Sequence, residues 1–305
     1  TSWHAHEMFF GYTGAVLAGF LLTAVRRWSG GHLTAANGSL AALCTLWLVG
    51  RILHAPGVAG GWWSALPDVG WLLGTTVAIG RPLVRAGSRR NYGFLVALPL
   101  LAVASLGMHL SDEPLRRQSL EVPIAVMAAI MAVVAGRIVP MFTRNALGVE
   151  STRVGWIEKV LPLGLGAVVV VTVAPSSDPV AGGVYGCVGM LVLGRMVGWK
   201  SLSTVSAPLL WILHIGHFWI GAGLLLLGAA GFGLVEISAG RHAITAGAIG
   251  SLTLGMMARV SLGHTGRELR VTRLTSVAFM MMVLAGLLRV TASLVGTSQQ
   301  LLNGA

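Results

Sequence analysis

The chain of 305 residues is 55% hydrophobic and only 10% charged, whereas ordinary soluble domains carry roughly 25% charged residues. This composition excludes a soluble globular protein and indicates a polytopic membrane protein. The formal net charge of +11 does not indicate nucleic-acid binding, because the basic residues stand singly at the ends of apolar runs, where they set membrane topology. Cys44 and Cys187 lie inside apolar segments, so we interpret them as small buried hydrophobic side chains and expect no disulfide framework.

Ten apolar runs come near the roughly 20 residues that a helix needs to cross a bilayer. Short connections separate them, so we predict an all-α, polytopic transmembrane helix bundle that forms a single domain over residues 1–305. Thr1 stands where an initiator Met is expected, which indicates a fragment of a longer protein. The predicted spans are residues 6–25, 35–54, 62–80, 92–110, 120–141, 155–174, 180–198, 207–230, 241–258 and 274–296.

Basic residues follow the odd-numbered spans, as Arg26 and Arg27 follow the first and Lys200 follows the seventh. The alternate loops are poor in basic residues, and residues 56–61 carry no charge at all. By the positive-inside tendency, the basic loops are cytoplasmic. We therefore predict a multi-pass protein whose opening residues face the outside, which in a bacterium is the periplasmic side of the inner membrane.

The opening Trp3-His4-Ala5-His6-Glu7 places two imidazoles and a carboxylate at the mouth of the first span. A bilayer tolerates such groups only with a partner or an ion, and neutral imidazole is a common ligand for iron, copper and zinc. His4 and His6 do not share one face of a helix, so they bind one metal only if the first turn is extended. Glu7 can bind the metal with His4 or hold an imidazole by a hydrogen bond. The alternative is that these side chains lie in the wet interface and meet lipid headgroups.

Other histidines lie deeper or at span ends. His214 and His217 stand at positions i and i+3 of the eighth span, so both project from one face of that helix into the bundle. They can bind a metal, or each can bond a backbone carbonyl as a core histidine. His242 begins the ninth span and lies near the outer face. His54 and His109 end their spans without a partner in sequence, and we interpret them as interfacial.

Arg137 lies inside the apolar run of the fifth span. It must extend to the membrane surface or pair with an anion, for which a haem propionate or a substrate carboxylate is suitable. Arg144 ends the same span, and the positive-inside tendency explains it. His264 is predicted on the cytoplasmic side, so any ligand it binds belongs to a second site or to a gate.

Several motifs, in order across nearly the whole chain, resemble the NnrS family of haem- and copper-containing inner-membrane proteins associated with the response to nitric oxide. The resemblance implies about twelve spans in the full protein, so that one span before Thr1 and one after Ala305 are missing here. The chain departs from the family at Arg26 and Arg27, where proline and asparagine are frequent, and at His217, where an aromatic residue is frequent. The motifs are Trp3-His4-Ala5-His6-Glu7-Met8, Gly19-Phe20-Leu21-Leu22-Thr23-Ala24-Val25, Gly136-Arg137, Phe142-Thr143-Arg144-Asn145-Ala146, Leu213-His214-Ile215-Gly216, Met257-Ala258-Arg259 and Gly263-His264-Thr265-Gly266-Arg267. The polar positions that match the family pattern are His4, His6, Glu7, Arg137, Arg144, His214, His242, Arg259 and His264.

From the resemblance and the residues together we expect haem and copper as cofactors. The expected ligands are His4, His6, His214 and His242, with His217 as an optional one. Glu7 is expected to support an imidazole, and the expected anion or propionate partners are Arg137, Arg144 and Arg259.

Three functions remain open from the sequence. The first is a redox metalloprotein that binds or processes nitric oxide or relieves nitrosylated iron. The second is a transporter of metal, haem or a metal complex, although no internal repeat is evident that would identify inverted halves. The third is an assembly or scaffold protein for a respiratory complex. The lipid bilayer is the expected surrounding in each case, and nucleic acid is not an expected partner.

Overall fold

The computed structural model describes residues 2–31, 37–56, 58, 62–110, 113–174 and 178–303, with backbone only for residues 2, 113, 114 and 297–303. The described residues form helices joined by short connections and contain no strand, which confirms the predicted all-α class. The chain divides into two compact units, Thr1–Val126 and Met127–Ala305, and each unit is described by itself. That both belong to a single transmembrane domain stays a prediction.

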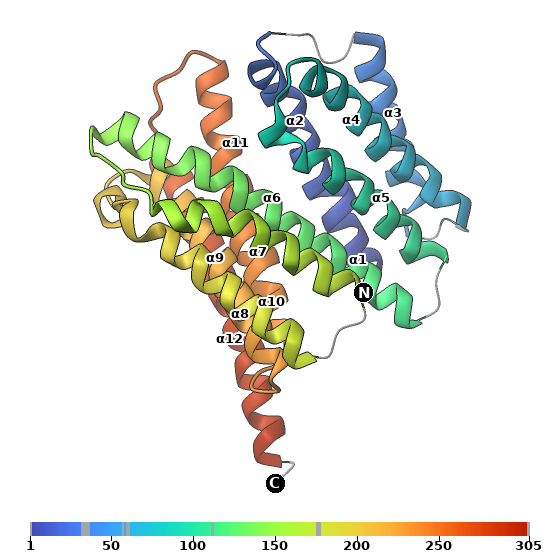
Figure 1. Cartoon of the computed structure of the whole chain (residues 1–305), viewed down its shortest axis with the longest axis vertical. Helices are drawn as coiled ribbons and strands as arrows, with labels where there is room; N and C mark the ends of the chain where they lie inside the picture. The colour runs from blue at the N-terminus through green and yellow to red at the C-terminus, as the bar shows by residue number, and fades with distance from the viewer. Residues whose placement is uncertain are drawn as a thin grey trace. The chain divides into compact units, whose positions relative to one another are not determined.

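Unit 1 packs around α4, which contacts α2, α3 and α5 (Figure 1). Leu72, Ile79 and Leu83 of this helix are almost fully buried. Helix α2 ends at Trp28 because Gly30 and Gly31, which follow it, adopt positive φ angles of 67° and 97°. Only glycine adopts such angles readily. The elements are α1 (Ser2–His6), the π-helical η1 (Glu7–Thr13), α2 (Gly14–Trp28), α3 (Asn37–Leu53), η2 (Trp62–Ala65), α4 (Leu66–Arg85), η3 (Arg89–Asn91), α5 (Gly93–Leu110) and the start of α6 (Glu113–Leu147).

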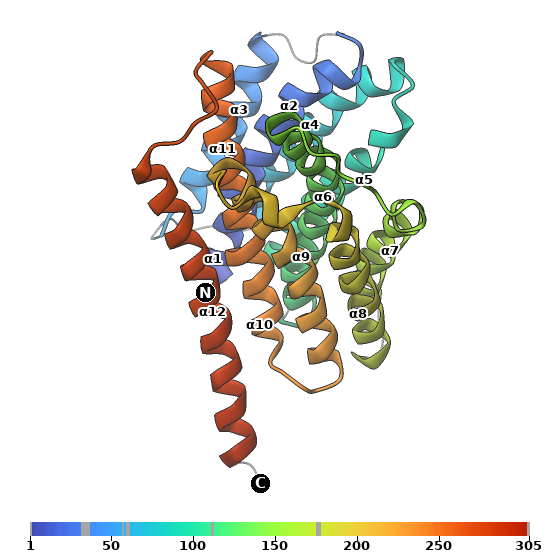
Figure 2. The ribbon, with the colours of Figure 1, turned by 90° about the vertical axis from the view of Figure 1, so that its left-hand side faces the viewer.

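Unit 2 packs around α9, which contacts α8, α10 and α11, and Figure 2 shows α10 beside α12. The α8–α9 contact is close because glycines face each other across it. A Cβ atom at Gly228 would lie 2.9 Å from the backbone nitrogen of Gly186 and 3.0 Å from the carbonyl oxygen of Gly182. Small residues at such positions let membrane helices approach each other. After α6 the elements are α7 (Gly155–Val173), α8 (Asp178–Gly194), η4 (Arg195–Gly198), η5 (Ser201–Thr204), α9 (Pro208–Gly231), α10 (Ile237–His242), the π-helical η6 (Ala243–Ile249), α11 (Gly250–His264) and α12 (Arg273–Asn303).

A buried ion pair explains one sequence motif of unit 2. The Arg195 guanidinium donates to both carboxylate oxygens of Glu158 at 2.5 Å, and to the carbonyl oxygen of Ala132 at 2.9 Å. A Cβ atom at Gly136 would overlap this guanidinium. Gly136 therefore stands before Arg137 because α6 must leave room for the Arg195 side chain.

Each of the ten predicted spans coincides with a helix of the structure. Eight helices of the described residues are long and apolar enough to cross a membrane, as expected of a multi-pass membrane protein. The predicted spans 35–54 and 62–80 correspond to helices outside those eight: α3 has 17 residues, and α4 carries Asp68, Arg81 and Arg85. The eight are Trp3–Trp28, Arg89–Leu110, Leu115–Leu147, Gly155–Val173, Asp178–Gly198, Pro208–Gly231, Ile237–His264 and Arg273–Gly296.

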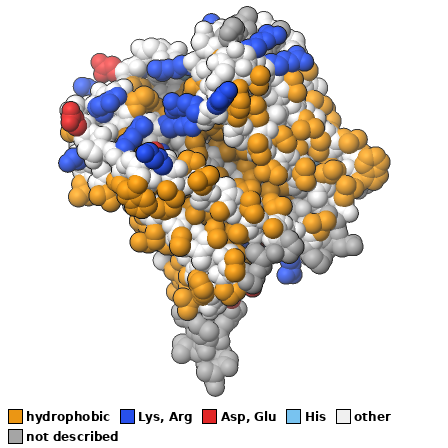
Figure 3. Space-filling view, viewed as in Figure 1, with side chains coloured by type: hydrophobic (Ala, Val, Ile, Leu, Met, Phe, Trp, Pro, Cys, Tyr) orange, Lys and Arg blue, Asp and Glu red, His pale blue; other side chains and the backbone are white. Residues whose placement is uncertain are grey.

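Hydrophobic side chains also cover much of the surface that Figure 3 shows. Leu163, Val170 and Met190, for example, are between 61% and 77% exposed, as expected of helix faces that meet lipid. The two cysteines belong to this exposed class. Cys44 and Cys187 are free and exposed, so the expectation that they are buried was wrong, because the helix faces that carry them point away from the protein interior.

Candidate metal centre

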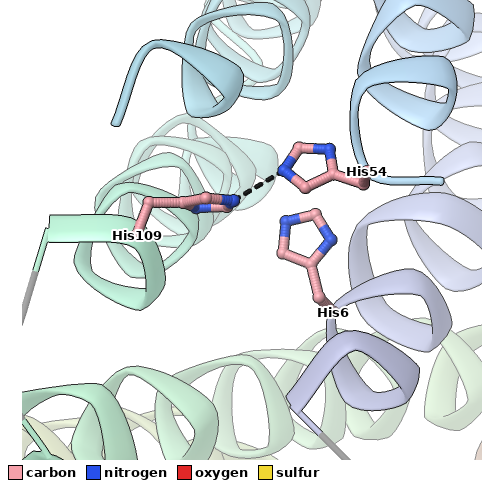
Figure 4. Close-up of side chains that lie close together, drawn as sticks. All are labelled: His6, His54 and His109. Atoms are coloured by element: carbon pink, nitrogen blue, oxygen red, sulfur yellow. Dashed lines mark hydrogen bonds between the residues drawn. The ribbon is translucent and has the colours of Figure 1, made fainter. Parts of the chain in front are cut away.

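Three histidines of unit 1 converge from separate segments of the chain. His6 ends α1, His54 directly follows α3, and His109 lies in the last turn of α5. One possible ligand atom of each lies within 4.8 Å of those of the other two. Figure 4 shows the three rings directed toward one another. His6 is buried, and the other two are partly buried.

The backbone fixes how the rings of His54 and His109 are protonated. The Nδ1–H of His54 donates to the carbonyl oxygen of Gly50 at 2.6 Å, and that of His109 donates to the carbonyl oxygen of Ser105 at 2.8 Å. In a neutral imidazole the other nitrogen is then an acceptor. The two Nε2 atoms nevertheless lie 2.6 Å apart, as the dashed line of Figure 4 marks. Two facing lone pairs at this distance repel each other unless one ring is also protonated at Nε2 or both nitrogens bind a metal ion.

His6 completes the cluster from one side. Its ring stacks on that of His54, with 4.2 Å between centroids and 28° between planes. Its Nδ1 lies 3.1 Å from Glu7 Oε1, and its Nε2 lies 3.2 Å from Asp68 Oδ2. A carboxylate that accepts from one ring nitrogen of an imidazole orients the ring and raises its basicity, as Glu7 can do at Nδ1. The Nε2 atom has no hydrogen-bond partner among the described residues, so it is the nitrogen left to bind a metal.

Arg51 joins the two carboxylates. Its guanidinium donates to Glu7 Oε1 at 2.6 Å and also forms a short hydrogen bond to Asp68 Oδ1. Asp68 is fully buried, and burying a charge is costly unless it is paired. Two carboxylates and one guanidinium leave one net negative charge in the cluster. Either a protonated His6, whose ring lies against both carboxylates, or a bound cation balances that charge.

Two glycines and the π-helical turn make room for this network. A Cβ atom at Gly11 would lie 3.0 Å from Glu7 Oε2 and 3.1 Å from Arg51 Nη1, and one at Gly50 would lie 2.6 Å from Asp68 Oδ1. Gly11 lies in η1, where the carbonyl oxygen of Gly11 accepts a hydrogen bond from Trp47 Nε1 at 3.1 Å. Such π-helical segments occur frequently at functional sites.

A hydrogen bond also connects the opening helix α1 to the backbone of His54. The indole Nε1–H of Trp3 donates to the carbonyl oxygen of His54 at 2.5 Å. His4, one residue later, is exposed and lies outside the three-histidine cluster. The structure therefore brings together His6 and Glu7 from the opening motif, but not His4.

The predicted ligands of the eighth span lie in unit 2. His214 is buried, and its ring nitrogens contact hydroxyl groups: Nε2 lies 2.9 Å from Thr143 Oγ1, and Nδ1 lies 2.8 Å from Ser201 Oγ. His217 is fully buried, and its ring packs on Trp199 with 4.5 Å between centroids. Both histidines are therefore buried on the inner side of α9, as their spacing predicts. Their role as metal ligands stays a prediction.

The remaining candidates are spread over unit 2. His242 is partly buried, with Nδ1 at 3.4 Å from Ser293 Oγ. Arg259 lies over the ring of Phe142, with Cζ 3.9 Å from the centroid, a cation–π contact. The other three differ in exposure: Arg137 is partly buried in α6, whereas Arg144 and His264 are exposed near the ends of α6 and α11.

Four residues of the centre were not identified as candidates from the sequence: His54, His109, Arg51 and Asp68. The two histidines were interpreted as interfacial because no sequence neighbour points to them. For Arg51 and Asp68, the sequence does contain a signal that could have identified them. Arg51 and Asp68 both lie within predicted spans, and a charge at such a position indicates a partner or a functional site.

Comparison with known proteins agrees with the motif resemblance. A family model described as NnrS protein matches residues 1–304. No curated protein and no solved structure matches the chain. The family match extends over both units, so it covers the three-histidine cluster as well as the predicted ligands of unit 2.

Proposed function

Because the chain belongs to the NnrS family, we propose that it binds copper at His6, His54 and His109 and acts in the response to nitric oxide or nitrosative stress through redox metal chemistry. The observation that carries the proposal is the pair of facing Nε2 acceptors of His54 and His109, 2.6 Å apart. Their Nδ1–H groups already donate to backbone carbonyls. A metal ion bound by both nitrogens would replace the lone-pair repulsion by two coordinate bonds of about 2.0–2.1 Å, once the two rings have moved apart.

The donor set supports copper at this place. Imidazole suits copper, zinc, iron and nickel, and three imidazoles form a common set for a metal that keeps a further position open. With His6 neutral, the net charge of minus one around the cluster balances Cu(I), which lowers the cost of burying the ion. Bound copper supplies one-electron chemistry and a coordination position for a small ligand such as nitric oxide.

Hydrogen bonds within the protein orient the three histidine rings for metal binding. The carbonyl oxygens of Gly50 and Ser105 fix the tautomers of His54 and His109. Asp68 and Glu7 hold the ring of His6, and Arg51 holds both carboxylates. Because the ligand rings are oriented before the metal arrives, little reorganisation accompanies binding.

The cluster is assigned to copper because three imidazoles that converge on one point suit a single metal ion. Haem as a cofactor therefore stays a prediction from the family resemblance, for residues outside this cluster.

The membrane orientation is part of the proposal. Basic residues concentrate after the odd-numbered spans, which supports an inner-membrane protein whose opening motif faces the periplasm. His6, His54 and His109 all lie near span ends that this orientation assigns to the periplasmic side. A small ligand such as nitric oxide would then reach the centre from that side.

Metal analysis of purified protein tests the proposal. The chain is loaded anaerobically with Cu(I), desalted and analysed for copper, alongside His54→Gln, His109→Gln and the control His4→Gln, which changes an exposed histidine of the opening helix. We expect about one copper per chain in the parent and the control, and at least a tenfold weaker affinity in the other two. Nitric oxide added to the loaded parent should change its absorption spectrum.

Two results would overturn the proposal. Copper binding that is equal in His54→Gln and the parent would show that a shared proton, not a metal, joins the two Nε2 atoms. Copper that enters vesicles through the protein, with no spectral response to nitric oxide, would favour the transporter hypothesis instead.

A further inference from the structure

The connection between α8 and α9 is fixed to unit 2 along its inner side. It contains the two short helices η4 and η5, and in Figure 1 it lies in yellow beside the green loop between α6 and α7. Arg195 of η4 is held by Glu158 and by the carbonyl oxygen of Ala132. Trp199 is fully buried and packs on His217. The connection is therefore an ordered part of the fold.

The outer side of the same connection is apolar. Leu202 is 89% exposed, Val197 82% and Val205 71%, and we call these three side chains the apolar edge. They alternate with the buried residues Trp199 and Thr204, so one side of the connection faces the protein and the other faces away from it. A loop in water normally carries polar residues at such positions. Apolar side chains that gather on a surface indicate that lipid or another molecule covers them.

Lys200 joins η4 to η5 with a backbone conformation that is unusual for lysine. Its φ and ψ angles are 56° and 41°, and in the described part of the chain no other residue besides glycine has a positive φ. A Cβ atom disfavours this left-handed conformation, which glycine or asparagine normally adopts. A residue kept in a disfavoured conformation points to a role for its side chain. The exposed ammonium group of Lys200 is what glycine could not supply.

The loop between α6 and α7 brings further cations to the same place. The backbone N–H of Thr152 donates to the carbonyl oxygen of Gly198 at 2.9 Å, and a Cβ atom at Gly198 would overlap Thr152. Arg153, the next residue, is exposed, and so is Lys159 in α7. Trp156 in the first turn of α7 is 60% exposed, and tryptophan is frequent where a helix crosses the membrane surface.

The charges of these two neighbouring segments are predominantly positive. Arg153, Lys159 and Lys200 are exposed, against the exposed carboxylate of Glu150. The carboxylate of Glu158 is already paired within the protein. Charge complementarity therefore favours an anionic partner for this surface.

We propose that the apolar edge and Lys200, with Arg153 beside them, bind an anionic phospholipid at the membrane surface. The candidate span that contains α8 ends at Gly198, so the connection lies where lipid headgroups begin. Lys200 and Arg153 donate to the headgroup phosphate, and the apolar edge meets the acyl chains. The positive-inside tendency accounts for a lysine in this loop, but it accounts neither for the left-handed backbone of Lys200 nor for the apolar edge.

The bound lipid also supports the cover over two buried histidines. Ser201 Oγ lies 2.8 Å from His214 Nδ1, and Trp199 packs on His217, both from this connection. A lipid that holds the outer side of the connection stabilises this packing. All the residues invoked here belong to unit 2, so the copper centre of unit 1 is expected to be unaffected.

A spin label measures whether the apolar edge enters the lipid. Leu202→Cys is introduced after Cys44→Ala and Cys187→Ala and carries a nitroxide, in the purified full chain reconstituted in vesicles. The vesicles contain phosphatidylcholine with increasing amounts of phosphatidylglycerol, and relaxation by oxygen and by a water-soluble nickel chelate reports the surroundings of the label. The same label is measured with Lys200→Asn, because asparagine tolerates the left-handed backbone. The control is Arg267→Gln, which removes an exposed charge elsewhere in unit 2.

We expect the label to pass from water into lipid as phosphatidylglycerol increases, and the melting temperature to rise with it. Lys200→Asn should shift the insertion equilibrium about fivefold toward water at a given lipid composition. Arg153→Gln, the second charge variant, should act in the same direction, whereas Arg267→Gln should match the parent. Copper content should be the same in every variant.

Three results would each overturn the proposal. Equal insertion of the label in pure phosphatidylcholine would show that no anionic headgroup is needed. Equal insertion in Lys200→Asn and the parent would show that the ammonium group does not hold the lipid. A label that stays in water in every lipid mixture, but is shielded in native membranes, would assign the apolar edge to a protein partner instead.

Discussion

Asp68 has no exposed surface, yet it carries a charge inside a membrane protein. It is tolerated because Arg51 donates to it and the ring of His6 lies 3.2 Å away. The residue thereby connects α4 to two histidine-bearing segments, since Arg51 belongs to α3. We expect Asp68 to hold the histidine rings in place, as carboxylates commonly do beside metal-binding histidines.

Asp68→Asn tests this role. The amide keeps the shape but loses the charge, so Arg51 retains only Glu7 as an anionic partner. We expect copper affinity to fall about 10–100-fold and the free energy of unfolding to fall by about 1.5–3 kcal/mol. Copper titration and thermal melting of purified protein measure both.

The matched control for this change is Glu268→Gln. Glu268 and Arg270 form an ion pair of 3.5 Å whose side chains are 81% and 88% exposed, and exposed pairs contribute little. Its copper affinity and melting temperature should equal those of the parent. If the copper affinity of Asp68→Asn equals that of this control, Asp68 does not support the metal centre.

The ion pair of Arg195 with Glu158 predicts a stability effect without a metal effect. Both side chains are less than one quarter exposed, and removing one partner of a buried pair costs about 3–5 kcal/mol. Glu158→Gln should therefore lower the melting temperature clearly while copper content stays at the parent level. Unchanged melting would mean that Arg195 finds another acceptor at little cost.

Single residues also mark the limit of what the sequence predicts. His6 and Glu7 were recognised because they stand together at the mouth of a span. His54 and His109 each stand alone in sequence, and only the packing of α3 and α5 brings their Nε2 atoms to 2.6 Å. A ligand pair assembled from distant segments leaves no local pattern, so the sequence favoured His4, which is adjacent but exposed.

At the scale of elements, glycine determines how closely helices approach. Backbone atoms of α8 lie only 2.9–3.0 Å from the place that a Cβ atom of Gly228 in α9 would take. Not every glycine has this role, since a Cβ atom at Gly183 of α8 would have no atom within 4 Å. Substitutions at Gly228 and Gly183 therefore distinguish the effect of helix packing on stability from the effect of helix propensity.

Gly228→Ala should destabilise the protein by about 1–3 kcal/mol, because the added methyl forces α8 and α9 apart. Gly183→Ala should be neutral or slightly stabilising, because alanine favours the helix more than glycine does. Melting temperatures of the two variants in the same detergent compare them directly. Equal shifts in both would contradict the close contact.

Helix positions were predictable because each span must be apolar over a membrane's thickness, and all ten expected spans coincide with helices. The π-helical turns were not predictable in the same way. No residue pattern in the sequence distinguishes η1 (Glu7–Thr13) and η6 (Ala243–Ile249) from the α-helices that follow them.

At the scale of the whole molecule, the distribution of basic residues fixes a prediction about orientation. Positive residues are kept on the cytoplasmic side, so the loop with Lys200 should be cytoplasmic and the loop with Val58 periplasmic. Single cysteines are introduced as Lys200→Cys or Val58→Cys after Cys44→Ala and Cys187→Ala. A membrane-impermeant maleimide on intact cells should label only the Val58→Cys protein, and the reverse pattern would invert the topology.

X-ray absorption at the copper edge tests the central claim most directly, because it counts the ligands around the metal. The Cu(I)-loaded parent should show nitrogen ligands with the scattering pattern of about three imidazoles and no sulfur. His109→Gln should show one imidazole fewer, and His4→Gln should match the parent. A sulfur ligand, or an unchanged imidazole count in His109→Gln, would contradict a centre formed by His6, His54 and His109.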